Sequence, residues 1–366
     1  MKNDQAEMEM EFADEPSASR HDATEVEAVR EVDFPWEGIF REQLRFLLHY
    51  AVLAPSTHNT QPWKFDLTPE GIEVYADYSR RMPVVDPGNR ELLMSVGAAV
   101  FNLRVAASHF NMPFRVDYNL SGASELPLAT ISLASPESKN PASSGLGICL
   151  ANIPLRHTNR SPFLVSRIPS SVIAKLKSAA DGAQTEIVVT VDGALNQKVA
   201  DLVAEAEGLQ WSDAGFRKDL AEWIRPGGST RQDGIPGTVY GWKGPVDDLG
   251  AYATRVIDQG RLRAARDRNL CLEAPGLIVL ATEDSVSHWI EAGEVLQQLL
   301  LAIVREGLHA SYFNMPIQVP DFRTRLKALM PCSGWPQLLL RVGYCLTQSV
   351  PTPRRPLDAF LVHDAS

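Results

Sequence analysis

Two apolar helical segments of the chain share a pattern of small, amide and apolar residues. Gly97 precedes Asn102 and Leu103 at the same spacing at which Gly293 precedes Gln298 and Leu299, 196 residues later. A glycine on a helix lets a second backbone approach closely. A helix expected over 171–180 also matches one expected over 40–51, ahead of it in the other half. We therefore expect two copies of one α+β unit, packed helix against helix.

The expected halves cover residues 34–147 and 148–366, with mixed or antiparallel sheets flanked by helices. Period-two alternation and short apolar runs predict strands, at 72–75, 128–133, 187–191, 277–281 and 338–342. Residues 135–147 are rich in Ser, Pro, Asn and Gly, which is typical of a linker. Residues 210–245 combine aromatic residues with closely spaced glycines, which suits a lid-like insertion over a site. The alternative is an irregular surface excursion packed by its own aromatics.

The charge of −10 is concentrated at the N-terminus. Residues 1–33 hold eleven acidic and three basic residues, so the rest of the 366-residue chain is close to neutral. We interpret this segment as a disordered acidic tail. The remainder offers no basic face for nucleic acid, so no such partner is expected.

Cysteine spacing and apolar runs bear on metals and membranes. The four cysteines are scattered, without zinc-ligand spacing, so reduced thiols and no metal are expected. The acidic N-terminus does not match a signal peptide, and the longest apolar run, residues 299–304, is too short to span a bilayer. We expect a cytoplasmic protein without a membrane partner.

A short loop follows the first expected helix and carries an unusual set of residues. The segment from Ala54 to Phe65 combines a proline, hydroxyls, amides and the Gln-Pro-Trp run before a strand. This composition suits a loop that holds a polar, aromatic ligand. The alternative is a helix-to-strand connection whose hydroxyls satisfy its own backbone.

Two clusters of basic residues are candidates for binding an anion. In residues 155–163, Arg156 and Arg160 flank His157 and Thr158, and their guanidinium groups can converge on one phosphate. The alternative is a solvated basic turn. Near the C-terminus, Arg354 and Arg355 in a proline-rich segment can also reach a phosphate, or else lie exposed.

These motifs resemble those of the nitroreductase-like flavoproteins, and their order is most similar to the Acg branch of that superfamily. The resemblance covers about residues 36–360 and implies the nitroreductase-like fold. In that superfamily FMN lies at a dimer interface, held by an arginine motif from one subunit and a Pro-Ser loop from the other. The resemblance thus implies an FMN site with these residues: Arg156, His157, Thr158, Arg160, Arg354 and Arg355 toward the phosphate, Pro55, Ser56, Thr57 and Asn59 beside the ring, and Asn314 near its reactive nitrogen.

Only one such site can be built from this chain. Residues 181–186 lack the hydroxyls and the Gln-Pro-Trp run, and residues 1–40 lack the arginine motif. The chain is therefore expected to be a monomeric, covalent pseudo-dimer with a single FMN, and further oligomerisation stays open.

The resemblance implies two alternative functions. The first is an FMN-dependent oxidoreductase that passes electrons from NAD(P)H to a small electron-poor acceptor, such as a nitroaromatic or a quinone. The flavin carries this chemistry, so no catalytic side chain is expected. The second is an FMN-binding or sequestering protein with little redox turnover.

Overall fold

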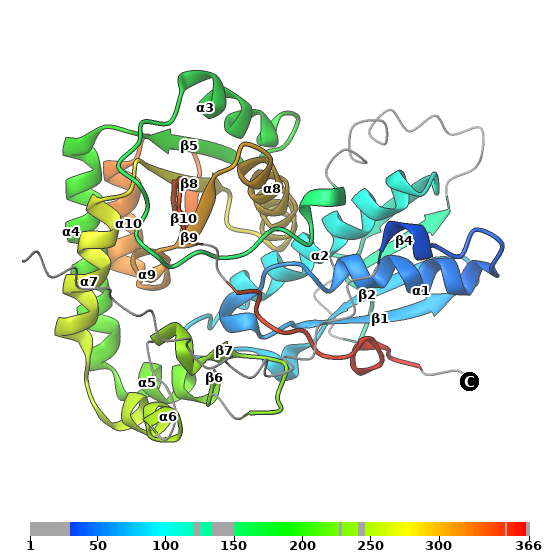
Figure 1. Cartoon of the computed structure of the whole chain (residues 1–366), viewed down its shortest axis with the longest axis horizontal. Coiled ribbons are helices and arrows are strands. Elements are labelled where there is room, and N and C mark those ends of the chain that lie inside the picture. The colour runs from blue at the N-terminus through cyan, green and yellow to red at the C-terminus, as the bar shows by residue number, and fades with distance from the viewer. Residues whose placement is uncertain are drawn as a thin grey trace, which may run out of the picture.

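A computed structural model describes residues 30–120, 125–133, 150–226, 229–240, 246–347 and 350–363. The expected linker and nearly all of the acidic tail lie outside these residues. Residues 31–33, which we placed in the tail, form a short 3-10 helix, η1 (Glu31–Asp33). Figure 1 shows two α+β lobes joined through the helices α2 and α8.

The first lobe is a four-stranded antiparallel sheet with helices on one face. Its elements are α1 (Phe40–Ala51), η2 (Thr57–Asn59), β1 (Trp63–Thr68), β2 (Gly71–Ala76), η3 (Tyr78–Arg80), α2 (Arg90–His109), β3 (Phe114–Tyr118) and β4 (Ala129–Leu133). The strand order is β1-β2-β4-β3. Along β1, Trp63, Phe65 and Leu67 are buried while the residues between them are half-buried, so this sheet is covered on one face.

The second lobe repeats this strand order. Its elements are α3 (Ser170–Lys177), η5 (Ser178–Ala180), β5 (Glu186–Thr190), β8 (Gly276–Thr282), α8 (Val286–Arg305), β9 (His309–Tyr312), α9 (Met315–Gln318), α10 (Pro320–Leu329), β10 (Trp335–Gly343) and η7 (Leu357–Phe360). Its sheet is antiparallel, in the order β5-β8-β10-β9. In both lobes, therefore, the first two strands of the lobe lie side by side, and its fourth strand lies between the second and the third. The five strands expected from the sequence are confirmed to within a few residues at their ends.

The second lobe also carries a long insertion, residues 191–275, between β5 and β8. It consists of α4 (Gly193–Ser212), α5 (Ala214–Glu222), β6 (Ile224–Arg225), β7 (Ile235–Pro236), η6 (Gly237–Tyr240), α6 (Val246–Val256) and α7 (Gly260–Leu272). It is longer than the expected lid at 210–245, because α4 and α7 also fall between the two strands. Trp242, one of the lid's predicted aromatics, lies outside the described residues.

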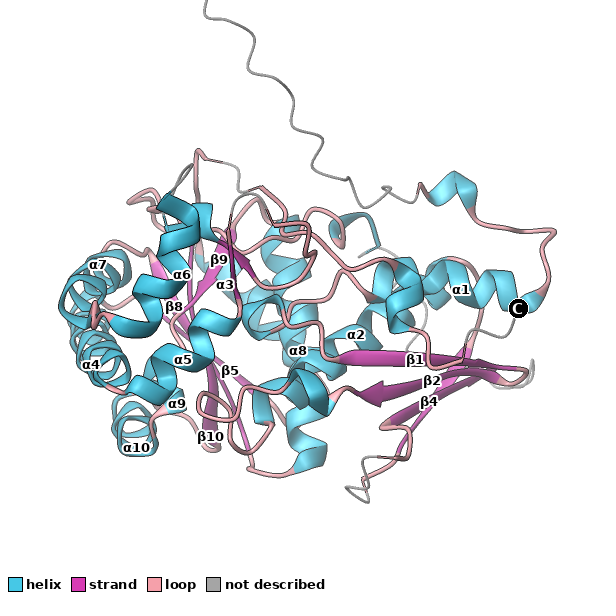
Figure 2. Ribbon diagram, turned by 90° about the horizontal axis from the view of Figure 1, so that it is seen from below, coloured by secondary structure: helices cyan, strands magenta, loops and turns pink. Residues whose placement is uncertain are grey.

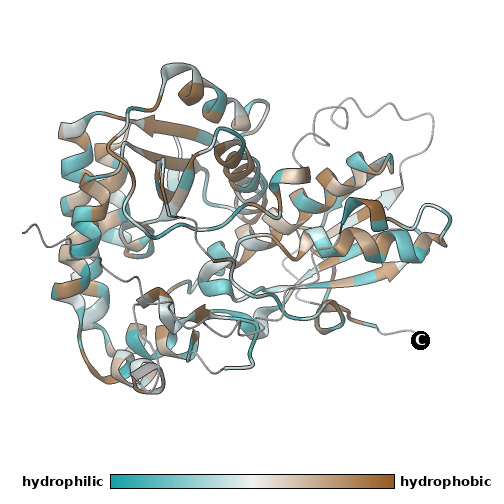
Figure 3. Ribbon diagram, in the orientation of Figure 1, coloured by the Kyte–Doolittle hydropathy of each residue, from teal (hydrophilic) through white to brown (hydrophobic). Residues whose placement is uncertain are grey.

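The insertion gives the second sheet a core on each face. Leu277, Val279 and Ala281 pack with α4, while Ile278 and Leu280 pack with α8. All seven residues of β8 are buried as a result. Figure 2 shows the helices on either side of this sheet, and the brown ribbon of α8 in Figure 3 shows that its residues are largely hydrophobic.

The two lobes meet where α2 crosses α8. A Cβ atom at Gly97 would overlap the carbonyl oxygen of Ile290, and one at Gly293 would overlap that of Met94. Each glycine thus contacts the residue three positions before the other glycine. A hydrogen bond between two buried amides also joins the helices, because Gln297 Nε2 donates to Asn102 Oδ1 at 2.7 Å.

Helix α2 is the most buried helix of the first lobe. Among the described residues it is the one helix long and apolar enough to cross a membrane, and 83% of the 18-residue window concerned is buried inside the protein. It is thus a core helix that packs on the first sheet and on α8.

Candidate functional site

The loop singled out in the sequence has a strained backbone. We call residues 54–61 the Pro-Ser loop. Three of its residues have positive φ: His58 at 50°, Asn59 at 55° and Gln61 at 52°. They are three of the five non-glycine residues with positive φ in the described chain. Such strain persists only when the surrounding structure holds it, and it concentrates at functional sites.

The two hydroxyls of the loop have different roles. Ser56 Oγ accepts a hydrogen bond from the Gln61 backbone N–H at 2.9 Å, so Ser56 satisfies its own loop. Thr57 Oγ1 instead donates to Glu91 Oε2 on α2 at 2.8 Å. Glu91 Oε1 in turn accepts from Gln318 Nε2 on α9 at 2.9 Å. Thr57 therefore connects the loop with the second lobe through the buried Glu91.

The arginine motif, residues 156–160, lies along the edge of the second sheet. Thr158 forms a parallel bridge with Ala310 of β9, and the Asn159 N–H donates to the Ala310 carbonyl at 3.0 Å. Arg156 Nη2 donates to the Leu53 carbonyl at 3.3 Å, just before the Pro-Ser loop. The fold thus brings together two motifs that are about 100 residues apart in the chain.

The C-terminal arm, residues 350–363, returns to the first lobe beside β1. Leu361 forms a parallel bridge with Phe65. Figure 1 shows the arm running along β1 and α1. The arm places Arg354 and Arg355 against the Pro-Ser loop.

Arg354 is buried and fastens the start of the loop. Its Nε donates to the Val52 carbonyl at 2.7 Å, and its Nη2 donates to the carbonyls of Leu53 and Ala54. These carbonyls belong to the three residues that follow α1. Its Nη1 also donates to Asn59 Oδ1 at 3.1 Å. Arg354 therefore positions the loop and is not the exposed residue of the alternative interpretation.

Arg355 contacts the other end of the loop. Its Nη2 donates to the Gln61 carbonyl at 3.1 Å, and its backbone N–H donates to Gln61 Oε1 at 3.0 Å. Its guanidinium group also lies over the Phe360 ring, 4.3 Å from the centroid. The two arginines of the arm thus form hydrogen bonds at both ends of the loop.

Two buried arginines of this region, Arg156 and Arg354, carry charge that no carboxylate in the described parts of the chain balances. Among the described residues, no carboxylate lies within ion-pair distance of Arg156 or Arg354. Burial lowers the pKa of Arg354, and the nearby Arg156 charge lowers it further. Arginine nevertheless stays protonated in proteins, and unpaired buried charge is costly. The site therefore favours an anionic ligand.

Some polar atoms of these residues have no partner. Arg156 Nε, Arg355 Nε and the Tyr312 hydroxyl are buried and have no hydrogen-bond partner among the described residues. The Arg156 guanidinium group and the Tyr312 hydroxyl interact electrostatically, and two such donors suit the several acceptor oxygens of a phosphate. The residues present therefore fit the phosphate group of a nucleotide such as FMN.

Two histidines of the site are neutral at neutral pH. Burial and the Arg160 charge lower the pKa of His58 to about 4. Burial, followed by the charges of Arg156 and Arg354, lowers the pKa of His157 to about 4. The positive charge of the site therefore belongs to the guanidinium groups, and an imidazolium is not part of it near pH 7.

These lowered pKa values predict a loss of stability in mild acid. An unfolded histidine titrates near pH 6.5, so between pH 6.5 and 4 the unfolded chain binds more protons than the folded chain. The free energy of unfolding therefore decreases as the pH is lowered through this range. His58 alone should account for roughly 3 kcal/mol across this range. Denaturant unfolding at pH 7.5, 6 and 5 measures the effect.

His58→Asn is the matched variant for this prediction. Asparagine tolerates the left-handed backbone at φ 50°. The variant should have nearly wild-type stability at pH 7.5 and lose less of it at pH 5. A variant as acid-sensitive as the wild type would contradict the assignment to His58.

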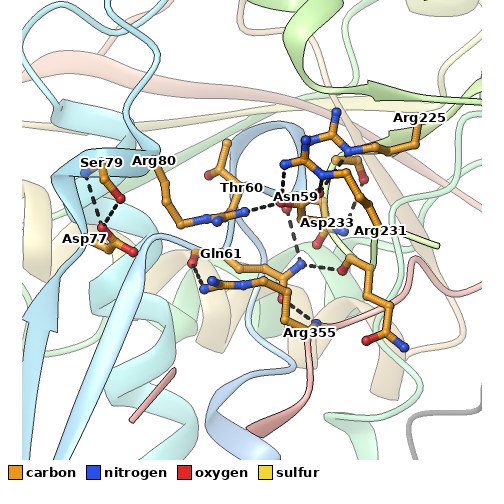
Figure 4. Close-up of polar contacts among 12 residues, drawn as sticks. Asn59, Thr60, Gln61, Asp77, Ser79, Arg80, Arg225, Arg231, Asp233 and Arg355 are labelled. Atoms are coloured by element: carbon orange, nitrogen blue, oxygen red, sulfur yellow. Dashed lines mark hydrogen bonds and ion pairs between the residues drawn. The ribbon is translucent and has the colours of Figure 1, made fainter. Parts of the chain in front are cut away.

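The insertion is attached to the Pro-Ser loop by a cluster of charged residues. Asp233 accepts hydrogen bonds from Arg225 Nε at 2.9 Å, from Arg231 at 3.1 Å and from Arg80, which also donates to the Thr60 carbonyl. Burial alone would raise the pKa of Asp233, but the hydrogen bonds from these arginines hold it well below its usual range. Figure 4 shows the side chains converging on this carboxylate.

Backbone contacts reinforce this attachment. The Gly234 N–H donates to the Asn59 carbonyl and Asn59 Nδ2 donates to the Gly234 carbonyl, each at 3.1 Å. Gln61 Nε2 donates to the Gln232 carbonyl at 2.8 Å. The Pro-Ser loop is thus held between the insertion and the C-terminal arm (Figure 4).

The remaining predicted residue, Asn314, has a structural contact. Its Oδ1 accepts a hydrogen bond from the Leu339 N–H at 3.1 Å, which ties the start of α9 to β10. Pro55 is buried within the loop.

Sequence reasoning missed Glu91, Tyr312 and Asp233, because nothing in their local sequence marks them. No cluster of three or more potential metal-ligating side chains occurs in the described parts of the chain.

Curated proteins similar to this chain come mainly from mycobacteria. The "Putative NAD(P)H nitroreductase Rv3131" of Mycobacterium tuberculosis is 28% identical over 322 residues, covering 87% of this chain and 90% of that protein. The "Putative NAD(P)H nitroreductase acg" of the same organism is 25% identical over 324 residues, covering 86% and 94%. No protein-family model matches the chain.

Among solved structures, the FMN-dependent nitroreductase NfnB from Mycobacterium smegmatis in complex with NADPH is similar to 57% of this chain. The likeness covers 94% of NfnB, at 18% identity and a TM-score of 0.37. The sequence relatives, in contrast, extend over most of both chains. The chain belongs to the nitroreductase-like superfamily, with Acg and Rv3131 among its relatives.

Proposed function

We propose that the chain binds one FMN between the Pro-Ser loop and the arginine motif and acts as an NAD(P)H-dependent oxidoreductase. The observation that carries this proposal is the pair of buried arginines beside the loop, Arg156 and Arg354, neither of which has a carboxylate within ion-pair distance among the described residues. Arg156, Thr158 and Arg160 would hold the phosphate. The bound flavin would supply the redox chemistry, passing electrons from NAD(P)H to an electron-poor acceptor such as a nitroaromatic or a quinone.

The protein's own residues would bind and position the cofactor. Arg354 and Asn59 hold the Pro-Ser loop in its strained conformation. Thr57, Glu91 and Gln318 fix the distance between the loop and the second lobe. Such prior positioning lowers the ordering cost of binding a ligand.

The single site follows from an internal duplication that we also propose. The identical strand order of the two sheets and the reciprocal glycine contacts support it. At the place in the second lobe that corresponds to the Pro-Ser loop, the Gln184 N–H donates to Glu291 Oε1 at 2.8 Å, and Gln184 contacts His288. Hydrogen bonds to α8 thus take the place of ligand-binding groups there. The chain would act as a monomeric pseudo-dimer with one FMN, in the cytoplasm.

One observation favours a second function, the sequestration of FMN. The Asp233 cluster joins the insertion to the loop through three arginines and through the backbone of Gly234. A cofactor site next to a segment held this firmly would exchange its ligand slowly. The same cofactor could then be retained without rapid turnover.

Reduction under anaerobic conditions tests the proposed function. We expect the purified protein to be yellow, to release about one FMN per chain on denaturation, and to bleach when mixed with NADH or NADPH. Reduction by dithionite serves as the control for an intact flavin. Flavin that dithionite bleaches and neither nucleotide reduces would support sequestration. A colourless protein that binds no added FMN would contradict both functions.

A further inference from the structure

Tyr312 carries a buried hydroxyl group for which the described structure provides no partner. It is the last residue of β9, two positions after Ala310, which pairs with Thr158 of the arginine motif. Side chains two residues apart on a strand lie on the same face. The bridge between Ala310 and Thr158 thus fixes Tyr312 beside the arginine motif.

Three charged side chains, those of Arg156, Arg160 and Glu91, act on this hydroxyl. Burial, which is the largest effect, and the Glu91 charge raise the pKa of Tyr312 to about 12, although the two arginines favour its ionised form. The hydroxyl is therefore protonated at neutral pH and can donate a hydrogen bond. Arginine side chains have no acceptor atom, so neither Arg156 nor Arg160 can accept it, and no hydrogen bond joins it to Glu91.

Two orphaned donors then lie close together. Arg156 Nε and the Tyr312 hydroxyl are both buried without a partner among the described residues. A buried donor without a partner bears the full cost of losing water. An oxyanion can satisfy both donors at once, because a phosphate group offers several acceptor oxygens.

We propose that the Tyr312 hydroxyl donates a hydrogen bond to the phosphate of the bound flavin nucleotide, alongside Arg156 Nε. This inference rests on the proposed function, since it concerns the same cofactor. It adds a binding residue from β9 to those of the arginine motif. It also accounts for a buried hydroxyl in a strand whose other described residues are His309, Ala310 and Ser311.

The test is Tyr312→Phe, which removes one oxygen atom and keeps the ring. Full-length wild type and variant are freed of flavin, and the dissociation constants for FMN and riboflavin are measured by quenching of flavin fluorescence. We expect the constant for FMN to rise about tenfold and that for riboflavin to stay the same, because riboflavin has no phosphate.

Stability without flavin provides a second measurement. An orphaned hydroxyl contributes nothing to the flavin-free protein, so Tyr312→Phe should unfold at the same temperature as the wild type or a higher one. With saturating FMN the wild type should become the more stable of the two. If Tyr312 had only a structural role, adding FMN would not change which of the two proteins is the more stable.

Tyr75→Phe is the matched control. The Tyr75 hydroxyl donates to Glu73 Oε2 at 2.6 Å, so it has a protein partner. Its removal should lower stability equally with and without flavin, and it should leave the ratio of the FMN and riboflavin constants unchanged.

The outcomes separate the two proposals. Wild type that binds neither FMN nor riboflavin overturns the proposed function. Wild type that binds FMN, together with a Tyr312→Phe variant of equal affinity, overturns only the role of Tyr312. Equal weakening of FMN and riboflavin places the contact outside the phosphate and overturns the inference. So does a flavin-free Tyr312→Phe protein that is destabilised as much as Tyr75→Phe.

Discussion

Replacing Gly97 or Gly293 with alanine should lower the free energy of unfolding by about 3 kcal/mol or more. The added Cβ atom would overlap a backbone carbonyl of the opposite helix in each case, at Ile290 or at Met94. A backbone carbonyl within a helix cannot turn away as the end of a side chain can, so α2 and α8 must move apart. The midpoint of thermal unfolding should fall by several degrees.

Gly208→Ala is the control for these variants. Gly208 lies within α4, and a Cβ atom there would meet nothing within 4 Å. Alanine is the better helix former, so this change should raise the free energy of unfolding by about 0.5–1 kcal/mol. Because the two contacts are reciprocal, Gly97→Ala and Gly293→Ala should have similar effects. Wild-type stability in either variant would show that the helices are not in close contact there.

Arg156→Ala should release the cofactor. A hydrogen bond from a charged group is worth on the order of 1.5–3 kcal/mol, so the dissociation constant for FMN should rise by about ten- to a hundredfold. The flavin-free protein should lose little stability, because the guanidinium group is buried without a carboxylate and its one described hydrogen bond, to the Leu53 carbonyl, is long at 3.3 Å. Flavin content per chain and titration with FMN measure the two effects.

Two further variants serve as controls for this prediction. Arg156→Lys keeps the charge but not the planar fork, and it should fall between the wild type and alanine. Arg325→Ala removes an exposed arginine paired with Glu205 on the far side of the second sheet, and it should leave FMN binding unchanged. Full flavin occupancy in Arg156→Ala would place the phosphate site elsewhere.

Local sequence patterns identified several strands of the two sheets. Alternation at residues 72–75 and the apolar run at residues 277–281 reflect one-sided and two-sided burial, so their strands are visible without a structure. The glycines of α2 and α8 mark the close crossing of the helices. The Pro-Ser loop and the arginine motif were also visible, because each groups its polar residues within a few positions.

Other features needed the tertiary structure. Glu91 joins the loop to α9, Arg354 binds the carbonyls just after α1, and Asp233 binds three arginines from two parts of the chain. Each of these side chains has its partners far away in sequence, so no local pattern can mark it. The true extent of the insertion likewise emerged only from the pairing of β5 with β8.

The sequence by itself determined the family, the two α+β units and the two motifs of the candidate site, because these depend on periodicity and on residues that are neighbours in the chain. The tertiary structure alone decided that both motifs and the C-terminal arm meet, and that Arg156 and Tyr312 keep unpaired donors there. Burial and hydrogen-bond satisfaction are properties of three-dimensional packing, and a linear sequence does not contain them.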